Sequence, residues 1–328
     1  MESAHTVARL AIETARDSLV VAWDSLDIVL ISMAGILPFS AARAGYYQVP
    51  GFPKVLYAVS SERYKNNETG VTTFAPPRTM WHEFLHKAIN AEDLHSRTDS
   101  PYVSGVGHFA MMGDNAELGS YTPEMLDPWH RLRRGWLRYY IPDAHTDSMN
   151  IRTPIDTLNF HLPIVEERDH GEIPAVLVIP VQQHPEITAH SVNWDQSDQH
   201  YFIIENRRAI GWDSVIVKHE MEKGDLYGVA EGVGGFLVWS VWRDPWGSQY
   251  SPYAWIHDAD GDFDTWKYVD RYGEPTDLFT GASGQDVFCT WSTSGVFDKA
   301  KELEGAEYLN WSRNVYITFA PYVDSSNV

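Results

Sequence analysis

The N-terminal part of the chain combines one helical pattern of apolar residues with two strand-like patterns. Residues 6–18 place apolar side chains on one face and charges on the other, which predicts an amphipathic helix. The β-branched run 26–32 predicts a buried strand, and residues 55–60 predict a second, shorter one. Residues 38–53 and 61–77 carry polar and turn-forming residues and are predicted as connections.

A second helix is predicted around residues 79–89. Thr79 is suited to be its N-cap. Apolar residues then recur at helical spacing and predict a helix buried on one side: Trp81, Phe84, Leu85, Ala88 and Ile89.

Beyond Pro142 the pattern changes from helical periodicity to short apolar runs separated by Gly, Pro and Asp. The predicted strands are 175–181, 200–206, 235–242, 254–257 and 315–320. Their spacing is typical of an all-β, sandwich-like module. We therefore expect an α+β protein with two domains, residues 1–145 and residues 146–328.

Composition narrows the classes of partner. The chain has 328 residues, and 25 Lys and Arg against 45 Asp and Glu give a formal net charge of −20. No basic run could follow a phosphate backbone, so nucleic acid is excluded as an expected partner. The longest apolar stretch, residues 26–39, is short and interrupted by Asp27 and Pro38, so no membrane insertion is expected.

Cysteine content limits the kind of metal site. The single cysteine, Cys289, excludes an internal disulfide framework and a cysteine-based zinc cluster. Histidine and carboxylate side chains are then the plentiful metal ligands. The N-terminus has no charged start followed by an apolar core, so the given sequence shows no secretory signal.

The predicted second helix contains a His-Glu-x-x-His sequence, formed by His82, Glu83 and His86. Residues four apart lie on one helix face, so both imidazoles can bind the same Zn²⁺. Glu83 then lies beside the ion, where it can act as general base toward water. This combination of residues predicts a zinc hydrolase.

A third protein ligand is expected, because hydrolytic zinc sites usually hold three and leave the fourth position to water. The following segment offers Glu92, Asp93 and His95. Asn90 tolerates left-handed dihedral angles, so it can turn the chain back toward the metal. With that turn we expect Asp93 as the ligand, and Glu92 is the alternative.

This segment resembles the metal-binding segment of the immune-inhibitor-A family of secreted zinc metallopeptidases, whose pattern is roughly His-Glu-x-x-His-x-x-Gly-x-x-Asp-Leu-Tyr. Asp93 and Leu94 stand where the family has Asp-Leu. The chain departs from the pattern at Asn90, which replaces Gly, and by one extra residue before it. Counting straight from His86 would instead put Glu92 at the Asp position.

Other segments extend the resemblance over most of the chain. Residues 105–113 are similar to the family's methionine-turn segment, which implies that Met112, or alternatively Met111, packs beneath the zinc as in metzincins. Residues 27–35, 128–136, 201–207, 211–213 and 235–239 resemble further family segments. The resemblance implies a metzincin-like catalytic domain, secretion, and further chain before the first helix, so we expect this chain to be truncated or unusually short at its N-terminus.

Two further groups of residues are candidates for chemistry. Four carboxylates follow the predicted strand 254–257 and suit Ca²⁺, although an ordinary acidic turn explains them equally well: Asp258, Asp260, Asp262 and Asp264. Tyr121 and His108 lie near the methionine turn in sequence and could stabilise a tetrahedral intermediate.

The expected function is a zinc-dependent endopeptidase that acts on protein or peptide substrates, with Glu83 as general base. The alternative is a catalytically silent, peptidase-like module that binds a protein or glycan surface through Trp242, Trp246 and Trp255. A zinc hydrolase acting on other bonds is a further alternative. An intact Glu83 favours the enzyme, because a site that only binds metal has no need of this carboxylate.

Overall fold

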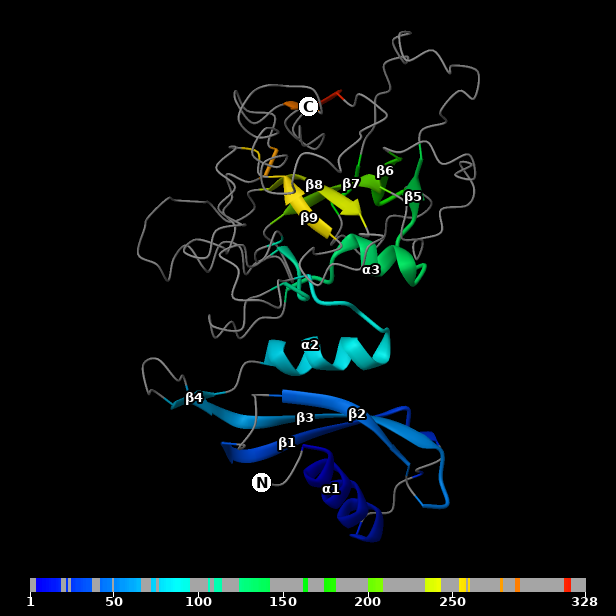
Figure 1. Ribbon diagram of the computed structural model, residues 1–328, viewed down its shortest axis with the longest axis vertical. Helices are drawn as coiled ribbons and strands as arrows, with labels where there is room; N and C mark the ends of the chain where they lie inside the picture. Colours follow the sequence, from blue (N-terminus) through cyan, green and yellow to red (C-terminus); the bar gives the residue numbers. More distant parts are fainter. Residues whose placement is uncertain are drawn as a thin grey trace, which may run out of the picture. The chain divides into compact units, whose positions relative to one another are not determined.

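The computed structural model describes the following residues: 4–18, 22, 25–36, 42–48, 50–65, 72–74, 77–94, 106, 109–113, 124–141, 162–164, 174–180, 200–208, 234–242, 254–257, 259, 278–279, 287–289 and 316–319 (Figure 1). The chain divides into two compact units. The first comprises residues 1–92 and 115–124, and the second comprises residues 93–114 and 125–328. This division differs from the predicted break at residue 145, because β5 before that break pairs with β6 after it.

The first unit contains a mixed sheet and two helices. Its elements are α1 (Ala4–Ser18), β1 (Ile28–Ile36), β2 (Ala42–Gln48), β3 (Lys54–Lys65), β4 (Thr72–Phe74) and α2 (Pro77–Ala88). The strand order is β1-β3-β2, and β4 also pairs with β3. β1 runs parallel to β3, whereas β2 and β4 run antiparallel to it.

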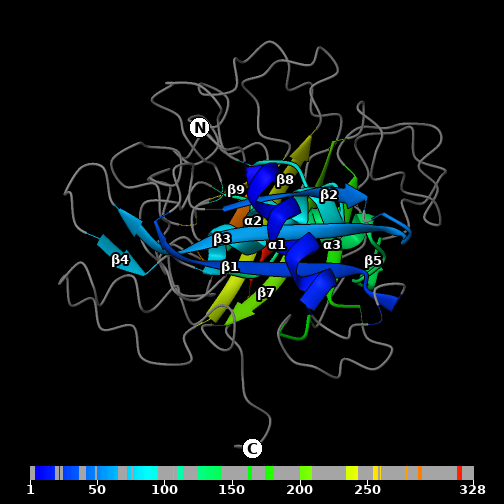
Figure 2. The same cartoon turned by 90° about the horizontal axis from the view of Figure 1, so that it is seen from below.

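Helices cover both faces of this sheet, as Figure 1 shows. Ala8 and Ile12 of α1 are buried against alternate residues of β3, Val55, Tyr57 and Val59. Figure 2 shows α1 lying across the strands of this face. Since side chains alternate along a strand, Leu56 and Ala58 point to the opposite face, where α2 contacts β2 and β3.

Strand β2 corrects the prediction that residues 38–53 form a loop. Arg43, Tyr46 and Gln48 break the apolar alternation, because among the described strands β2 pairs with β3 only and its side chains are mostly exposed or half-buried. Gly45 lies opposite Tyr57 in the ladder. A Cβ at this position would come within 2.6 Å of the Tyr57 hydroxyl oxygen, so glycine leaves room for the Tyr57 ring against β2.

The second unit contains a five-stranded sheet with the order β5-β6-β7-β8-β9. Its elements are α3 (Pro128–Arg133), β5 (Tyr139–Tyr140), β6 (Val176–Pro180), β7 (His200–Arg208), β8 (Gly234–Trp242) and β9 (Ala254–His257). β5 and β6 are parallel and the remaining neighbours are antiparallel. β10 (Val287–Cys289) and β11 (Tyr316–Thr318) form a separate antiparallel pair.

The two faces of the five-stranded sheet differ in chemistry. One face packs into an apolar cluster formed by Leu162, Leu177, Phe202, Ile204, Val238, Ala259, Phe279 and Phe319. The other face carries the buried polar residues Glu205 and Arg207 beside Trp239. Alternation along β7 therefore separates an apolar core from a buried charged layer.

Most of the predicted elements are confirmed with shifted ends. The helix predicted at 6–18 is α1, and the predicted strands of the second half correspond to β6, β7, β8, β9 and β11. The strands predicted at 26–32 and 55–60 are longer in the structure, as β1 and β3. The run 26–32 is not buried as predicted, because Ile28 and Leu30 are 40% and 49% exposed. The predicted connection 61–77 contains the end of β3 and the whole of β4. The sandwich-like arrangement and the metzincin fold stay predictions. No helix in the described part of the chain has the length and apolar character needed to span a membrane.

Candidate metal centre

Helix α2 carries His82, Glu83 and His86, as predicted, but it differs from the prediction in two ways. It begins at Pro77, so Thr79 is a helical residue and not the N-cap. Proline suits the first helical position, because its missing N–H would be unbonded there. The predicted buried stripe is also wrong: Arg78 is buried, whereas Trp81, Phe84, Leu85 and Ile89 are half-buried and Ala88 is exposed.

Arg78 fixes the start of the helix through a buried ion pair. Its Nε donates to Glu124, and the side chains of Arg78 and Glu124 are 4% and 0% exposed. Apolar periodicity gives no sign of such an anchor, because it depends on a charge brought from elsewhere in the chain.

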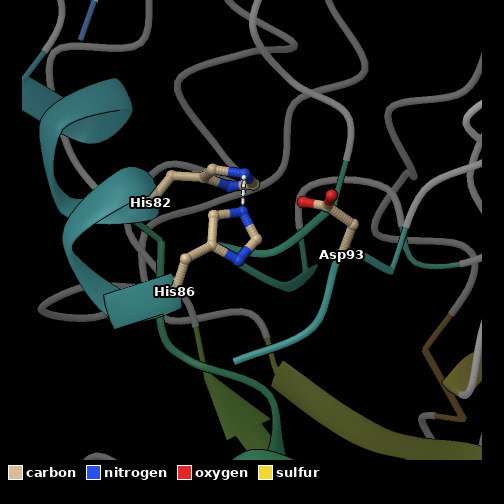
Figure 3. A group of neighbouring side chains, drawn as sticks. All are labelled: His82, His86 and Asp93. Carbon is tan, nitrogen blue, oxygen red and sulfur yellow. Dashed lines mark hydrogen bonds between the residues drawn. The ribbon is translucent and has the colours of Figure 1, made fainter. Parts of the chain in front are cut away.

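The two histidines of α2 face each other. Their Nε2 atoms are 3.1 Å apart, and the ring centroids are 4.7 Å apart with the planes at 88° (Figure 3). The spacing of one helical turn produces this approach. Both side chains are half-buried, so the nitrogens lie in a partly desolvated position.

The backbone after α2 orients His86. Its Nδ1 lies 2.7 Å from the carbonyl oxygen of Ala91. A carbonyl only accepts, so Nδ1 carries the proton and the Nε2 lone pair of the neutral ring is directed at His82. A carbonyl partner of this kind is a common way to orient a metal-binding histidine.

Asn90 makes the turn that leads to the third candidate ligand. Its φ is 51°, the left-handed region in which Asn is among the favoured residues after Gly. The amides of Ile89 and Ala91 both donate to the Leu85 carbonyl, at 3.1 and 3.2 Å, and close the end of the helix. The predicted turn is confirmed.

Asp93 joins the two histidines. One ligand atom from each of His82, His86 and Asp93 lies within 4.8 Å of the other two, and all three side chains are half-buried. Figure 3 shows the carboxylate of Asp93 on the side toward which both imidazoles point. Glu92, the alternative ligand, does not belong to this group.

The donor set fits Zn²⁺. A tetrahedral ion about 2.0 to 2.2 Å from each ligand keeps the ligand atoms roughly 3.3 Å apart, close to the 3.1 Å between the two Nε2 atoms. Two imidazoles and one carboxylate supply three ligands and leave one position open, as in catalytic zinc sites.

Glu83 of α2 forms an ion pair with Arg43 of β2. Arg43 Nη1 is 3.0 Å from Glu83 Oε1, and the two side chains are 49% and 23% exposed. Tyr46, also on β2, donates to the Lys87 carbonyl at 2.7 Å. The sequence analysis missed Arg43, because it assigned this strand to a loop.

The predicted methionine turn is a buried turn at residues 109–113. The amides of Phe109 and Gly113 donate to the carbonyls of Val106 and Ala110, both at 3.0 Å. Met112 is fully buried, and its carbonyl accepts the amide of Leu94 at 2.9 Å. The residue after Asp93 is thus hydrogen-bonded to this turn.

Comparisons with protein-family models, with curated proteins and with solved structures give no match.

Several predicted site residues lie outside the described residues. They are His95, His108, Tyr121, Trp246 and the four calcium candidates Asp258, Asp260, Asp262 and Asp264. Trp242 and Trp255 lie on β8 and β9, but their side chains are outside the described part.

A second histidine and aspartate pair lies at the start of α3. Asp127 is the N-cap, and its Oδ1 accepts the His130 amide at 2.9 Å while His130 Nδ1 donates to Oδ2 at 2.6 Å. Burial disfavours the ionised carboxylate, but the charge and hydrogen bonds of His130 outweigh it, so the pKa of Asp127 lies below its ordinary value. This pair caps a helix, and sequence reading identified neither residue.

Proposed function

We propose that this chain is a zinc-dependent endopeptidase of the immune-inhibitor-A type. The observation that carries the proposal is the convergence of His82, His86 and Asp93, with the carboxylate of Glu83 on the same helix. The ordered motif resemblance along the chain supports the family assignment and the expected secretion.

The proposed mechanism assigns one role to each side chain. His82, His86 and Asp93 would hold the ion, and the Ala91 carbonyl keeps His86 in the tautomer that exposes Nε2. When bound, Zn²⁺ would polarise the scissile carbonyl and lower the pKa of the attacking water to about 7. Glu83 takes a proton from this water and passes it to the leaving amine.

Arg43 bears on the role of Glu83. Its Nη1 donates to one oxygen of Glu83, Oε1, at 3.0 Å. The second oxygen then remains to act as base. At this half-exposed position the pair adds little stability, at most about 1 kcal/mol.

The test compares three substitutions in the full chain: Glu83→Gln, Asp93→Asn and Glu92→Gln. Bound zinc and cleavage of casein are measured for each. We expect Glu83→Gln to retain zinc and lose roughly 10²- to 10⁴-fold in kcat/KM. Asp93→Asn should lower zinc occupancy, and Glu92→Gln, the matched control one residue away, should leave zinc and activity near the wild type.

Other outcomes would decide for the alternatives. Zinc bound by the wild type without cleavage of any peptide substrate favours a binding module. If Glu83→Gln cleaves casein as fast as the wild type, Glu83 is not the general base and the proposed mechanism is wrong. If Glu92→Gln loses zinc and Asp93→Asn retains it, the third ligand is Glu92 and not Asp93.

A further inference from the structure

Strand β7 contains a fully buried ion pair that the proposed mechanism does not use. Arg207 Nη1 lies 2.7 Å from Glu205 Oε1, and both side chains are 0% exposed. The indole N–H of Trp239 donates to the same oxygen at 2.8 Å. Residues two apart on a strand share one face, so the sequence Glu-x-Arg places both charges in the same layer.

Such a pair is a costly way to fill a core. Removing two charges from water costs several kcal/mol for each ion, which the attraction between them only partly offsets. Arg131 of α3 lies 3.9 Å from the other oxygen of Glu205, so a second cation also faces this carboxylate. Apolar residues of similar size would fill the layer at lower cost, which points to a use for the charges.

A second contact of Arg207 identifies this use. Its Nη2 donates to the Phe109 carbonyl at 3.3 Å, at the first residue of the 109–113 turn. Glu205 and Trp239 hold the guanidinium in one orientation, because its planar fork of donors is rigid. The turn is thereby fixed from the sheet.

Two backbone hydrogen bonds extend the connection from this turn. The Met111 amide donates to the Met125 carbonyl at 3.0 Å, and the Met112 carbonyl accepts the Leu94 amide at 2.9 Å. Leu94 is itself fully buried and directly follows Asp93. A shift of the turn therefore moves the backbone that carries the Asp93 carboxylate.

We propose that Arg207 is a positioning residue for the third metal ligand, acting through the Phe109 carbonyl and the 109–113 turn on Asp93. The inference rests on the proposed function, because it assigns Asp93 to a metal. Arg207 itself is separated from Asp93 by the turn and would touch neither metal nor substrate.

The test uses Arg207→Lys, which keeps the positive charge for Glu205 but removes the fork that bonds Glu205 and Phe109 together. Arg208→Lys, the same change one position along β7 and thus on the opposite face, is the control. Zinc affinity is measured by chelator competition. We expect 10- to 100-fold weaker binding for Arg207→Lys, the range seen when outer partners of metal ligands are removed, and less than 2-fold change for the control.

A double-mutant cycle separates this role from general support of the fold. In an Asp93→Asn background the third ligand is already altered, so Arg207→Lys should change zinc affinity less than 2-fold. An equal loss in both backgrounds, or no loss in the wild-type background, overturns the inference while leaving the metal site itself standing. A wild type that binds no zinc overturns the proposed function and this inference together.

A second readout needs no metal. Hydrogen exchange of peptides covering residues 93–113 should be faster in metal-free Arg207→Lys than in the wild type, because the amides of Leu94 and Met111 lose a fixed partner. If hydrogen exchange of these peptides is unchanged, Arg207 does not act on Asp93 through the 109–113 turn. Should Arg207→Lys not fold, Trp239→Phe removes one donor to Glu205 and keeps the charge pair; a several-fold loss of zinc affinity is then expected, and wild-type affinity overturns the inference.

Discussion

At the scale of single residues, Asn90 joins the helix that carries two candidate ligands to the segment that carries the third. Its positive φ is tolerated by Asn and Gly but strained for β-branched residues. We expect Asn90→Gly to bind zinc like the wild type. Asn90→Val should lose about 1–3 kcal/mol of stability and bind zinc more weakly. Chelator competition and thermal unfolding measure the two effects. If Asn90→Val binds zinc and unfolds like the wild type, the turn does not position Asp93.

Residue-scale prediction succeeded where the chemistry is local in sequence. His82, His86 and Asp93 lie within twelve positions, so helical spacing and one turn bring their ligand atoms together. Arg43 and Arg207 were missed as partners, because they lie 40 and 98 residues from Glu83 and Phe109. No local pattern predicts which distant residues pair.

At the scale of elements, the N-cap residue Asp127 stabilises the short helix α3. It caps α3 and also bonds the buried ring of His130. Asp127→Ala removes the cap and leaves a buried donor unbonded, so we expect a loss of about 2–4 kcal/mol in the free energy of unfolding. Asp127→Asn keeps an acceptor for the His130 amide and should lose less. Denaturant titration measures both, and equal losses would mean that the acceptor retained by Asn contributes nothing and that the carboxylate charge carries the effect.

Element-scale prediction depended on how each strand is covered. β7 and β8 are central strands buried on both faces, so their apolar residues are nearly continuous and the prediction found them within two residues of their ends. In the part of the chain that the structure describes, β2 pairs with β3 alone, and its side chains are mostly exposed or half-buried. It consequently has no apolar alternation and was predicted as a loop.

At the scale of the whole molecule, His257 should make stability depend on pH. It is fully buried on β9 with its ring 5.7 Å from that of Phe202, and burial lowers the pKa of His257 to about 3 from 6.5. Below pH 6.5 the His257 ring of the unfolded chain binds a proton, whereas the buried ring of the folded protein stays neutral. His257 thus destabilises the fold by up to about 1.4 kcal/mol for each pH unit from 6.5 down to about 3, and the effect is absent above pH 6.5.

The measurement is denaturant unfolding of metal-free protein at pH 7.5 and pH 5.5, for the wild type and His257→Leu. The variant should lose less stability between the two values, by about 1 kcal/mol. Identical losses would show that His257 does not govern this pH range.

The sequence by itself determined the elements with strong periodicity and the placement of His82 and His86 on one helix face, because residues four apart in a helix converge. It left Asp93 and Glu92 as alternatives for the third ligand, and the tertiary structure groups Asp93 with the two histidines. Tertiary structure alone decided the order of the strands, the edge strand β2, and the pairing of Arg78, Arg43 and Arg207 with distant carboxylates and carbonyls. The physical reason is that a buried charge is tolerated only beside a partner, and that partner is supplied by the folded chain.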